Sequence, residues 1–359
     1  MAKIHALFKV MLDEGASDLH MTSGQKPALR IHGEIKPIDS HNVLDHYQLR
    51  TMLFEITPDN KKADFEKTGD VDFGYELPGV ARFRANMFQQ KFGCAAVFRQ
   101  IPSKILSTQD LGLPSILTRA AMLRKGLVLV TGPTGSGRST TLAAMLDHAN
   151  RNRQDHIMTI EDPIEFVHQS QGCVVNHREV GVHTKSFATA LRAALREDPD
   201  IILVGEMRDP DTIRLAVEAA ATGQLVFGTL RTTSAVKAVD AVIEAFPYEE
   251  QGQIRTILST SLKLVVAQNL FRRIDTKGRC AALEILVCTN AIATLIREEK
   301  TFQIASAMQA GKTAGMQSLD DAILDLLNKK WISPEEAYEK CNEKAKFTSF
   351  LKTPPDELA

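Results

Sequence analysis

A glycine-rich segment carries the clearest chemical signal in the sequence. It closely follows the phosphate-binding pattern G-x-x-x-x-G-K-[ST] and consists of Gly132, Pro133, Thr134, Gly135, Ser136, Gly137, Arg138, Ser139 and Thr140. Glycines let backbone N–H groups converge on phosphate oxygens, and a following helix adds the positive end of its dipole. Ser139 is placed to bring its hydroxyl to Mg²⁺. A glycine-rich turn without a ligand is the weaker reading, so the segment predicts nucleotide binding.

One position departs from that pattern. Arg138 stands where the consensus has lysine. A lysine ammonium is a compact point charge, whereas a guanidinium is wider and planar, so the two are not interchangeable. We expect Arg138 to keep the attraction to phosphate but to misplace positive charge in the transition state.

Acidic and hydroxyl residues follow three further apolar runs. Glu161, Asp162 and Glu165 come after the first run, where carboxylates could orient an attacking water or support Mg²⁺. Glu206 ends the second run in a Walker-B-like pattern, with glycine in the position before it. Arg231 follows the third run among hydroxyl residues. Taken alone, an acidic proline turn and an ordinary helix cap are the alternatives for the first and third groups.

The elements that must position these residues are strands alternating with helices. Continuous aliphatic runs at 126–130, 156–160, 201–204 and 224–227 predict strands buried in a parallel sheet, and 139–150 predicts a helix. This alternation indicates an α/β fold with a doubly wound domain. We expect the C-terminal third to be mostly helical. Its last long helix should be capped by Ser333, with Glu336 closing a capping box.

The first hundred residues have a different texture. Short strand-like pieces, at 27–32 and 81–88, are mixed with an amphipathic segment that places Leu7, Phe8, Met11 and Leu12 on one helical stripe. The stretch 101–114 contains two prolines and scattered polar residues and predicts a linker. The sequence therefore predicts an N-terminal domain over 1–100, a linker over 101–114 and a second domain over 115–359.

Composition excludes several classes of protein. The chain has 359 residues, a net charge of -1 and 44% hydrophobic residues, which suits about two folded domains. A near-zero charge gives no support for nucleic acid as a partner. No run reaches the roughly 18 apolar residues of a membrane span. The five cysteines have no C-x-x-C spacing, so we expect inert thiols and no zinc site.

The combined motifs resemble the type IV pilus retraction ATPases, the twitching-motility branch of the secretion ATPase superfamily. The resemblance covers nearly the whole chain. Besides the phosphate-binding loop, it rests on the runs 16–20, 82–86, 96–99, 161–163, 203–209, 295–298 and 315–319.

The resemblance implies a PAS-like N-terminal domain and a RecA-like ATPase domain assembled as a homohexameric ring. It further implies ATP and Mg²⁺ as ligands, with Arg82, Arg84 and Arg99 approaching the phosphates and Glu165 as first choice for water activation. The expected location is the cytoplasm, at the inner face of the cytoplasmic membrane. There the ring would dock on a platform protein of the pilus and power pilus retraction, that is, pilin disassembly.

Several family positions are altered in this chain. This chain has Gln224 and Arg231 at the two histidine positions of the family's histidine box. It has Arg138 at the position of the family's P-loop lysine, and Ala293 and Thr294 within the motif associated with retraction. These departures keep open a second function, an ATP-binding paralogue that hydrolyses little or no ATP. Such a protein would regulate the pilus machinery beside a paralogous retraction ATPase. Arg231 could also supply a cation near the γ-phosphate.

Overall fold

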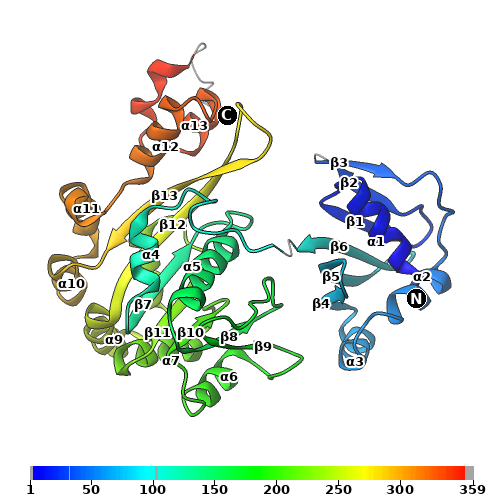
Figure 1. Ribbon diagram of the computed structural model, residues 1–359, viewed down its shortest axis with the longest axis horizontal. Coiled ribbons are helices and arrows are strands. Elements are labelled where there is room, and N and C mark those ends of the chain that lie inside the picture. Colours follow the sequence, from blue (N-terminus) through cyan, green and yellow to red (C-terminus); the bar gives the residue numbers. More distant parts are fainter. Residues whose placement is uncertain (1–2, 32, 102–103, 352–359) are drawn as a thin grey trace. The chain divides into compact units, whose positions relative to one another are not determined.

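The structure is a computed structural model that describes residues 3–31, 33–101 and 104–351. Its contacts divide the chain into two compact units (Figure 1). The first unit comprises residues 1–104 with the short segments 162–167 and 179–183, and the second holds the remainder. Pro102 and Ser103 of the predicted linker, and His32 at the end of a predicted strand, lie outside the described residues. The predicted domain limits at 101–114 remain a prediction.

The first unit is built on a six-stranded antiparallel sheet with the order β3-β2-β1-β6-β5-β4. The strands are β1 (Asp18–Thr22), β2 (Ala28–Ile31), β3 (Glu34–Pro37), β4 (Asp70–Leu77), β5 (Ala81–Gln90) and β6 (Gly93–Ile101). Its helices are α1 (Ile4–Asp13), α2 (His46–Phe54) and α3 (Asp59–Thr68).

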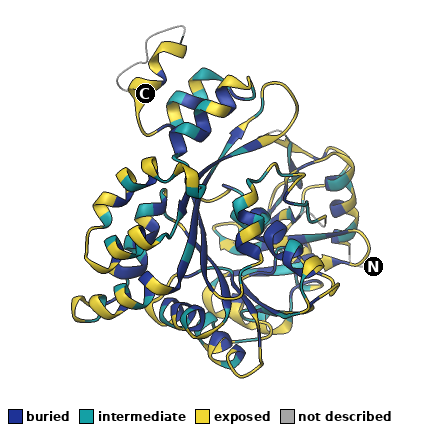
Figure 2. Ribbon diagram, turned by 60° about the vertical axis from the view of Figure 1, so that its left-hand side comes forward, coloured by how far each residue is buried: buried dark blue, intermediate teal, exposed yellow. Residues whose placement is uncertain are grey.

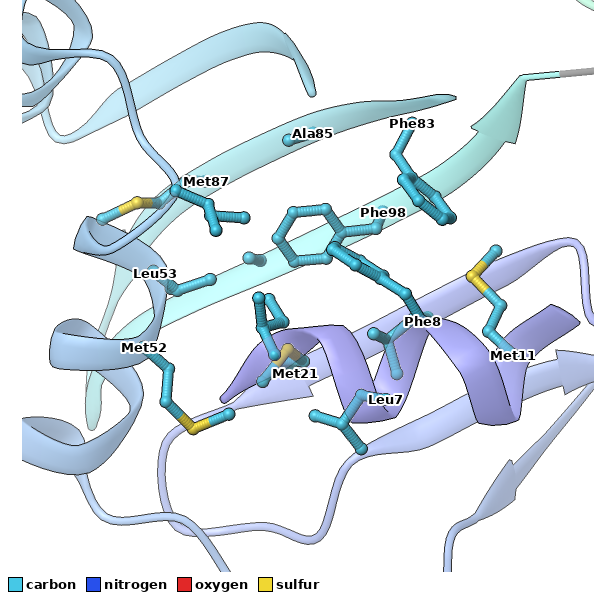
Figure 3. Close-up of a cluster of buried hydrophobic side chains, with 14 of the residues drawn as sticks. Leu7, Phe8, Met11, Met21, Met52, Leu53, Phe83, Ala85, Met87 and Phe98 are labelled. Carbon is cyan, nitrogen blue, oxygen red and sulfur yellow. The ribbon is translucent and has the colours of Figure 1, made fainter. Parts of the chain in front are cut away.

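Helix α1 buries most of the apolar stripe that the sequence predicted, and Leu12 is partly covered. Leu7, Phe8 and Met11 are fully covered, and the ring of Phe8 stacks on Phe83 with centroids 4.1 Å apart (Figure 3). Phe98 meets the same ring edge-on at 5.1 Å. Aromatic pairs of this kind add stabilisation beyond the area they bury, so the three rings hold α1 against the sheet.

The second unit is built on a seven-stranded sheet with the order β13-β12-β7-β11-β10-β8-β9. The strands are β7 (Gly126–Thr131), β8 (His156–Glu161), β9 (Val174–Glu179), β10 (Ile201–Val204), β11 (Leu225–Leu230), β12 (Leu262–Arg272) and β13 (Arg279–Val287). The helices up to β12 are α4 (Ser115–Ala121), α5 (Arg138–Asn152), α6 (Phe187–Ala194), α7 (Pro210–Thr222), α8 (Ala235–Glu244) and α9 (Tyr248–Ser261). After β13 come α10 (Asn290–Arg297), α11 (Ile304–Ala310), α12 (Leu319–Asn328) and α13 (Pro334–Lys340).

The central strands of this sheet run parallel. β12, β7, β11, β10 and β8 are joined by parallel pairings, whereas β13 pairs with β12 antiparallel. Every residue of β7, β10 and β11 is buried, and Figure 2 shows these strands in dark blue. Strands covered on both faces must be apolar throughout, which is why continuous aliphatic runs located them. The predicted α/β fold is confirmed.

The C-terminal third differs from prediction in two respects. Helices dominate from α10 onward, but two long strands, β12 and β13, precede them and were not predicted. At α13 the Ser333 hydroxyl accepts from the N–H of Glu336 at 3.2 Å, as an N-cap should. The other half of the predicted capping box is wrong, because the Glu336 carboxylate accepts from the backbone N–H of Arg272 and from Lys340 instead.

Two further properties concern the described residues only. None of their helices has the length and apolar character required to cross a membrane. All five cysteines are unbonded thiols, and burial raises the pKa of each, that of Cys288 to about 11.

Candidate functional site

Four neighbouring strands of the second unit end at the predicted site residues. In the order β7-β11-β10-β8, their carboxyl ends lead to the glycine-rich loop, Arg231, Glu206 and Glu161. Because the strands are parallel, these ends meet at one edge of the sheet, which is where open α/β sheets bind ligands. Residues spread over a hundred positions of sequence are thereby collected in one place.

The glycine-rich loop connects β7 to the first turn of α5. Gly132, Gly135 and Gly137 have φ values of 149°, 79° and 88°, a region that favours glycine. A Cβ at Gly132 would also lie 2.4 Å from the carbonyl oxygen of Gln268. Helix α5 has 15 residues and begins directly at the loop, with Gly137 as N-cap and no side chain capping it. The first N–H groups of a helix have no acceptor within the helix, and this is where anions bind.

Ser136 supplies an independent sign of a ligand in this loop. Its side chain is buried, and its hydroxyl has no hydrogen-bond partner among the described residues. Buried hydroxyls are nearly always paired. A phosphate oxygen is a partner of the right chemistry, so the loop fits a nucleotide phosphate. Ser139 and Thr140, at the start of α5, are half-buried.

Gln268 on β12 contacts the phosphate-binding loop, and this role was not predicted from the sequence. Its Nε2 donates to the carbonyl of Ser136 at 2.7 Å, and its Oε1 accepts from the hydroxyl of Thr141 at 2.7 Å. One buried amide therefore ties the loop to the first turns of α5. A Cβ at Gly137 would lie 2.8 Å from the same Nε2. Sequence offers no signal for this contact, since the partners are more than 125 residues apart.

Arg138 is anchored to the neighbouring strand. Its Nη1 donates to the carbonyl oxygen of Leu230, the last residue of β11, at 2.5 Å. Thr131, the last residue of β7, donates to the same carbonyl at 3.1 Å and also bonds Thr232. The basic side chain of the loop is thus fixed in part by the end of β11.

Glu206 lies between two arginines. Arg231 approaches its carboxylate with two nitrogens, Nε at 2.5 Å from Oε1 and Nη2 at 3.2 Å from Oε2, and Arg208 forms a second ion pair with it. Burial raises the pKa of the Glu206 carboxyl, but the hydrogen bonds and charges of both arginines outweigh burial and leave the pKa below its ordinary value. Glu206 is therefore ionised at neutral pH. Arg208 was part of the recognised motif, yet its contact with Glu206 was not predicted.

The acidic residues Glu161, Asp162 and Glu165 fall into different units of the structure. Glu161 is buried at the end of the strand, and His177 on β9 lies 4.0 Å from it while bonding the hydroxyl of Thr159 at 2.8 Å. His177 is a second neighbour of the site that was not predicted. Asp162 is exposed and Glu165 half-buried, and both belong to the segment grouped with the first unit.

The three predicted arginines of the first unit each have a carboxylate partner within residues 1–104. Arg82 lies 3.5 Å from Glu76. Arg84 lies 3.7 Å from Asp72, and both side chains are partly exposed. Arg99 donates through Nε to the buried Asp18 at 2.8 Å. Their contact with phosphate stays a prediction.

The described residues contain no group of three or more histidine, cysteine, aspartate or glutamate side chains that could hold a metal ion. Mg²⁺ at a phosphate-binding loop is held by phosphate oxygens, water and few protein ligands, and here Ser139 and Glu206 are the side chains that could contribute.

Comparisons with known proteins bear on this site. The family described as type II/IV secretion system protein matches residues 1–337. The type IV pilus retraction ATPase PilT of Pseudomonas aeruginosa is 53% identical over 327 residues, which cover 91% of this chain and 94% of that protein. A twitching motility protein of Neisseria gonorrhoeae is 48% identical over 327 residues, covering 89% and 87%. The chain belongs to the pilus retraction ATPase branch of the type II/IV secretion system family.

A solved structure of a retraction ATPase supports the fold. The pilus retraction motor PilT with bound ADP superimposes with a TM-score of 0.88 at 42% identity, covering 96% of this chain and 99% of that one. The predicted family, the predicted fold of an N-terminal domain followed by an ATPase domain, and the predicted ATPase class are confirmed. Within this retraction ATPase, Arg138 and Arg231 are the departures that lie at the candidate site.

Proposed function

We propose that the chain is a hexameric motor ATPase that binds ATP with Mg²⁺ and powers type IV pilus retraction by pilin disassembly. The observation that carries this proposal is the single edge of the sheet where the phosphate-binding loop, Glu206 and Glu161 stand at the carboxyl ends of the parallel strands β7, β10 and β8. The similarity to a retraction ATPase over nine-tenths of the chain and the bound ADP of a similar motor support it.

The proposed roles follow from the chemistry of the residues. The loop from Gly132 to Thr140 holds the phosphates through backbone N–H groups, and the Ser139 hydroxyl contributes to Mg²⁺. Bound Mg²⁺ would neutralise charge on the phosphate oxygens. Glu206, which is ionised, is the main acid after β10, and Glu165 is our first choice for orienting water, with Glu161 and Asp162 as alternatives. Arg82, Arg84 and Arg99 would approach the phosphates from the first unit.

The proposed setting is the cytoplasmic face of the inner membrane, where the ring docks on a platform protein of the pilus. This placement rests on the function of the retraction ATPases that the chain resembles.

A second candidate function is a regulatory paralogue that binds ATP but turns it over weakly. The altered residues Arg138, Gln224 and Arg231 favour it. The guanidinium of Arg138 does not reproduce the charge placement of the P-loop lysine. Gln224 and Arg231 stand where the resembled family has histidines. A paralogous retraction ATPase would then perform the hydrolysis.

Complementation of a piliated strain lacking its retraction ATPase tests the proposal. The motor function predicts that the chain alone restores twitching motility and that Glu206→Ala does not. If the chain restores motility only when a second retraction ATPase is present, the regulatory function is correct and the motor proposal is wrong.

A further inference from the structure

Two of the altered residues are associated with the end of strand β11. Arg138 donates to the carbonyl of Leu230, and Arg231 is the next residue along the chain. Leu230 is paired in register with Thr131, the last residue of β7 before the phosphate-binding loop. The basic residue of the loop and the arginine after β11 are therefore linked through a single carbonyl group.

The ion pair with Glu206 uses only one edge of the Arg231 guanidinium. Nε and Nη2 face the two carboxylate oxygens, and Nη1 has no hydrogen-bond partner among the residues that the structure describes. The Arg231 side chain is 54% exposed, whereas that of Glu206 is 16% exposed. The carboxylate thus orients the guanidinium from the protein side and leaves its other edge available. A guanidinium can bind two anions at once because its five donors lie in one plane.

We infer that Arg231 replaces the missing P-loop lysine as the cation for the terminal phosphate of ATP, and that Glu206 positions it for this contact. In this arrangement Arg138 has a structural role, because its guanidinium donates to the carbonyl oxygen of Leu230. The inference rests on the proposed ATP site and adds the claim that the two substitutions function as a pair.

Charge and position both support this assignment. Arg231 follows β11, the strand that lies between the loop strand β7 and the Glu206 strand β10. An arginine supplied from the same chain can stabilise charge on a transferring phosphoryl group, and bidentate contacts to phosphate are a particular strength of guanidinium. An isolated surface ion pair is the competing explanation, and exposed pairs contribute little to stability.

The test compares ATPγS with ADP, because only the former carries a terminal third phosphate. Arg231→Gln should weaken binding of Mg-ATPγS by about tenfold or more and leave Mg-ADP affinity within about twofold. Steady-state kcat should fall by at least about tenfold. Arg192→Gln is the matched control, since Arg192 is also 54% exposed and pairs with a carboxylate, Asp211, at 3.3 Å. It should change neither affinity.

A double-mutant cycle tests the pairing. If Arg231 replaces the lysine, Arg138→Lys should recover most of the ATPγS affinity lost in Arg231→Gln, so the two effects should be strongly non-additive. Equal loss of ADP and ATPγS affinity, no loss at all, or purely additive effects would overturn the inference. A wild-type protein that binds neither nucleotide would contradict the proposed function itself. Wild-type binding with an unchanged Arg231→Gln variant would contradict only the inference.

Discussion

The amide of Gln268 should control both the stability of the second unit and its affinity for nucleotide. Gln268→Leu keeps the side chain close in volume but removes the donor to Ser136 and the acceptor for Thr141. Each buried group left unpaired costs about 1–3 kcal/mol, partly offset by the greater apolarity of leucine. A net loss of about 2–4 kcal/mol in the free energy of unfolding lowers Tm by roughly 5–10 °C for a unit of this size.

Nucleotide affinity should fall as well, because the Ser136 carbonyl lies within the phosphate-binding loop. If the loosened loop weakens the binding free energy by about 1.4 kcal/mol, the Kd for Mg-ATP rises about tenfold. Isothermal titration calorimetry and thermal melting measure the two effects on the same samples.

Gln317→Leu provides the matched control. Gln317 also donates through Nε2 to a backbone carbonyl, that of Leu283 at 3.2 Å, but it lies between α11 and α12. It should lower Tm and leave Mg-ATP affinity unchanged. If Gln268→Leu binds Mg-ATP as tightly as wild type while folded, the reasoning that this amide positions the loop is refuted.

Three further outcomes follow from the structure. Burial, assisted by the charge of His177, lowers the pKa of His168 from 6.5 to about 4, so the unfolded chain takes up the proton first and stability falls as pH falls through that interval. Urea denaturation should show wild type losing on the order of 2 kcal/mol between pH 7 and pH 5 relative to His168→Gln, and parallel losses would contradict the assignment. Phe8→Ala should destabilise the first unit by about 3–5 kcal/mol in the same assay, whereas a loss below about 1 kcal/mol would show that the ring is poorly packed. Arg208→Gln removes a cation from Glu206 and should raise the pKa of that carboxyl, which moves the acid limb of the kcat/KM profile to higher pH. An unmoved limb would mean that Glu206 is not the titrating group.

The sequence was most informative where a structural requirement is local. A strand buried on both faces needs a continuous apolar run, and a phosphate-binding loop needs glycine at fixed spacing. The runs at 126–130 and 201–204 were therefore found as β7 and β10.

Strand β12 was missed for a related reason. Helix α9 ends at Ser261 and β12 begins at Leu262, so no glycine or proline separates the two elements. An apolar run without such a boundary does not distinguish helix from strand by periodicity alone.

The contacts of the site could not be predicted because they join distant parts of the chain. Gln268 reaches Ser136 across 132 residues, and Arg231 reaches Glu206 across 25. The pairing of a particular donor with a particular acceptor depends on strand order, and strand order is set by the packing of the whole sheet. The sequence identified the residue types at the strand ends, and the structure shows which of them touch.

Steady-state ATP hydrolysis by the purified protein, measured beside a Glu206→Ala variant, tests whether the chain is itself a motor ATPase. We expect measurable turnover that depends on Mg²⁺ and is abolished by the substitution, because Glu206 is the ionised acid at the edge of the sheet. Turnover indistinguishable between wild type and Glu206→Ala would contradict it.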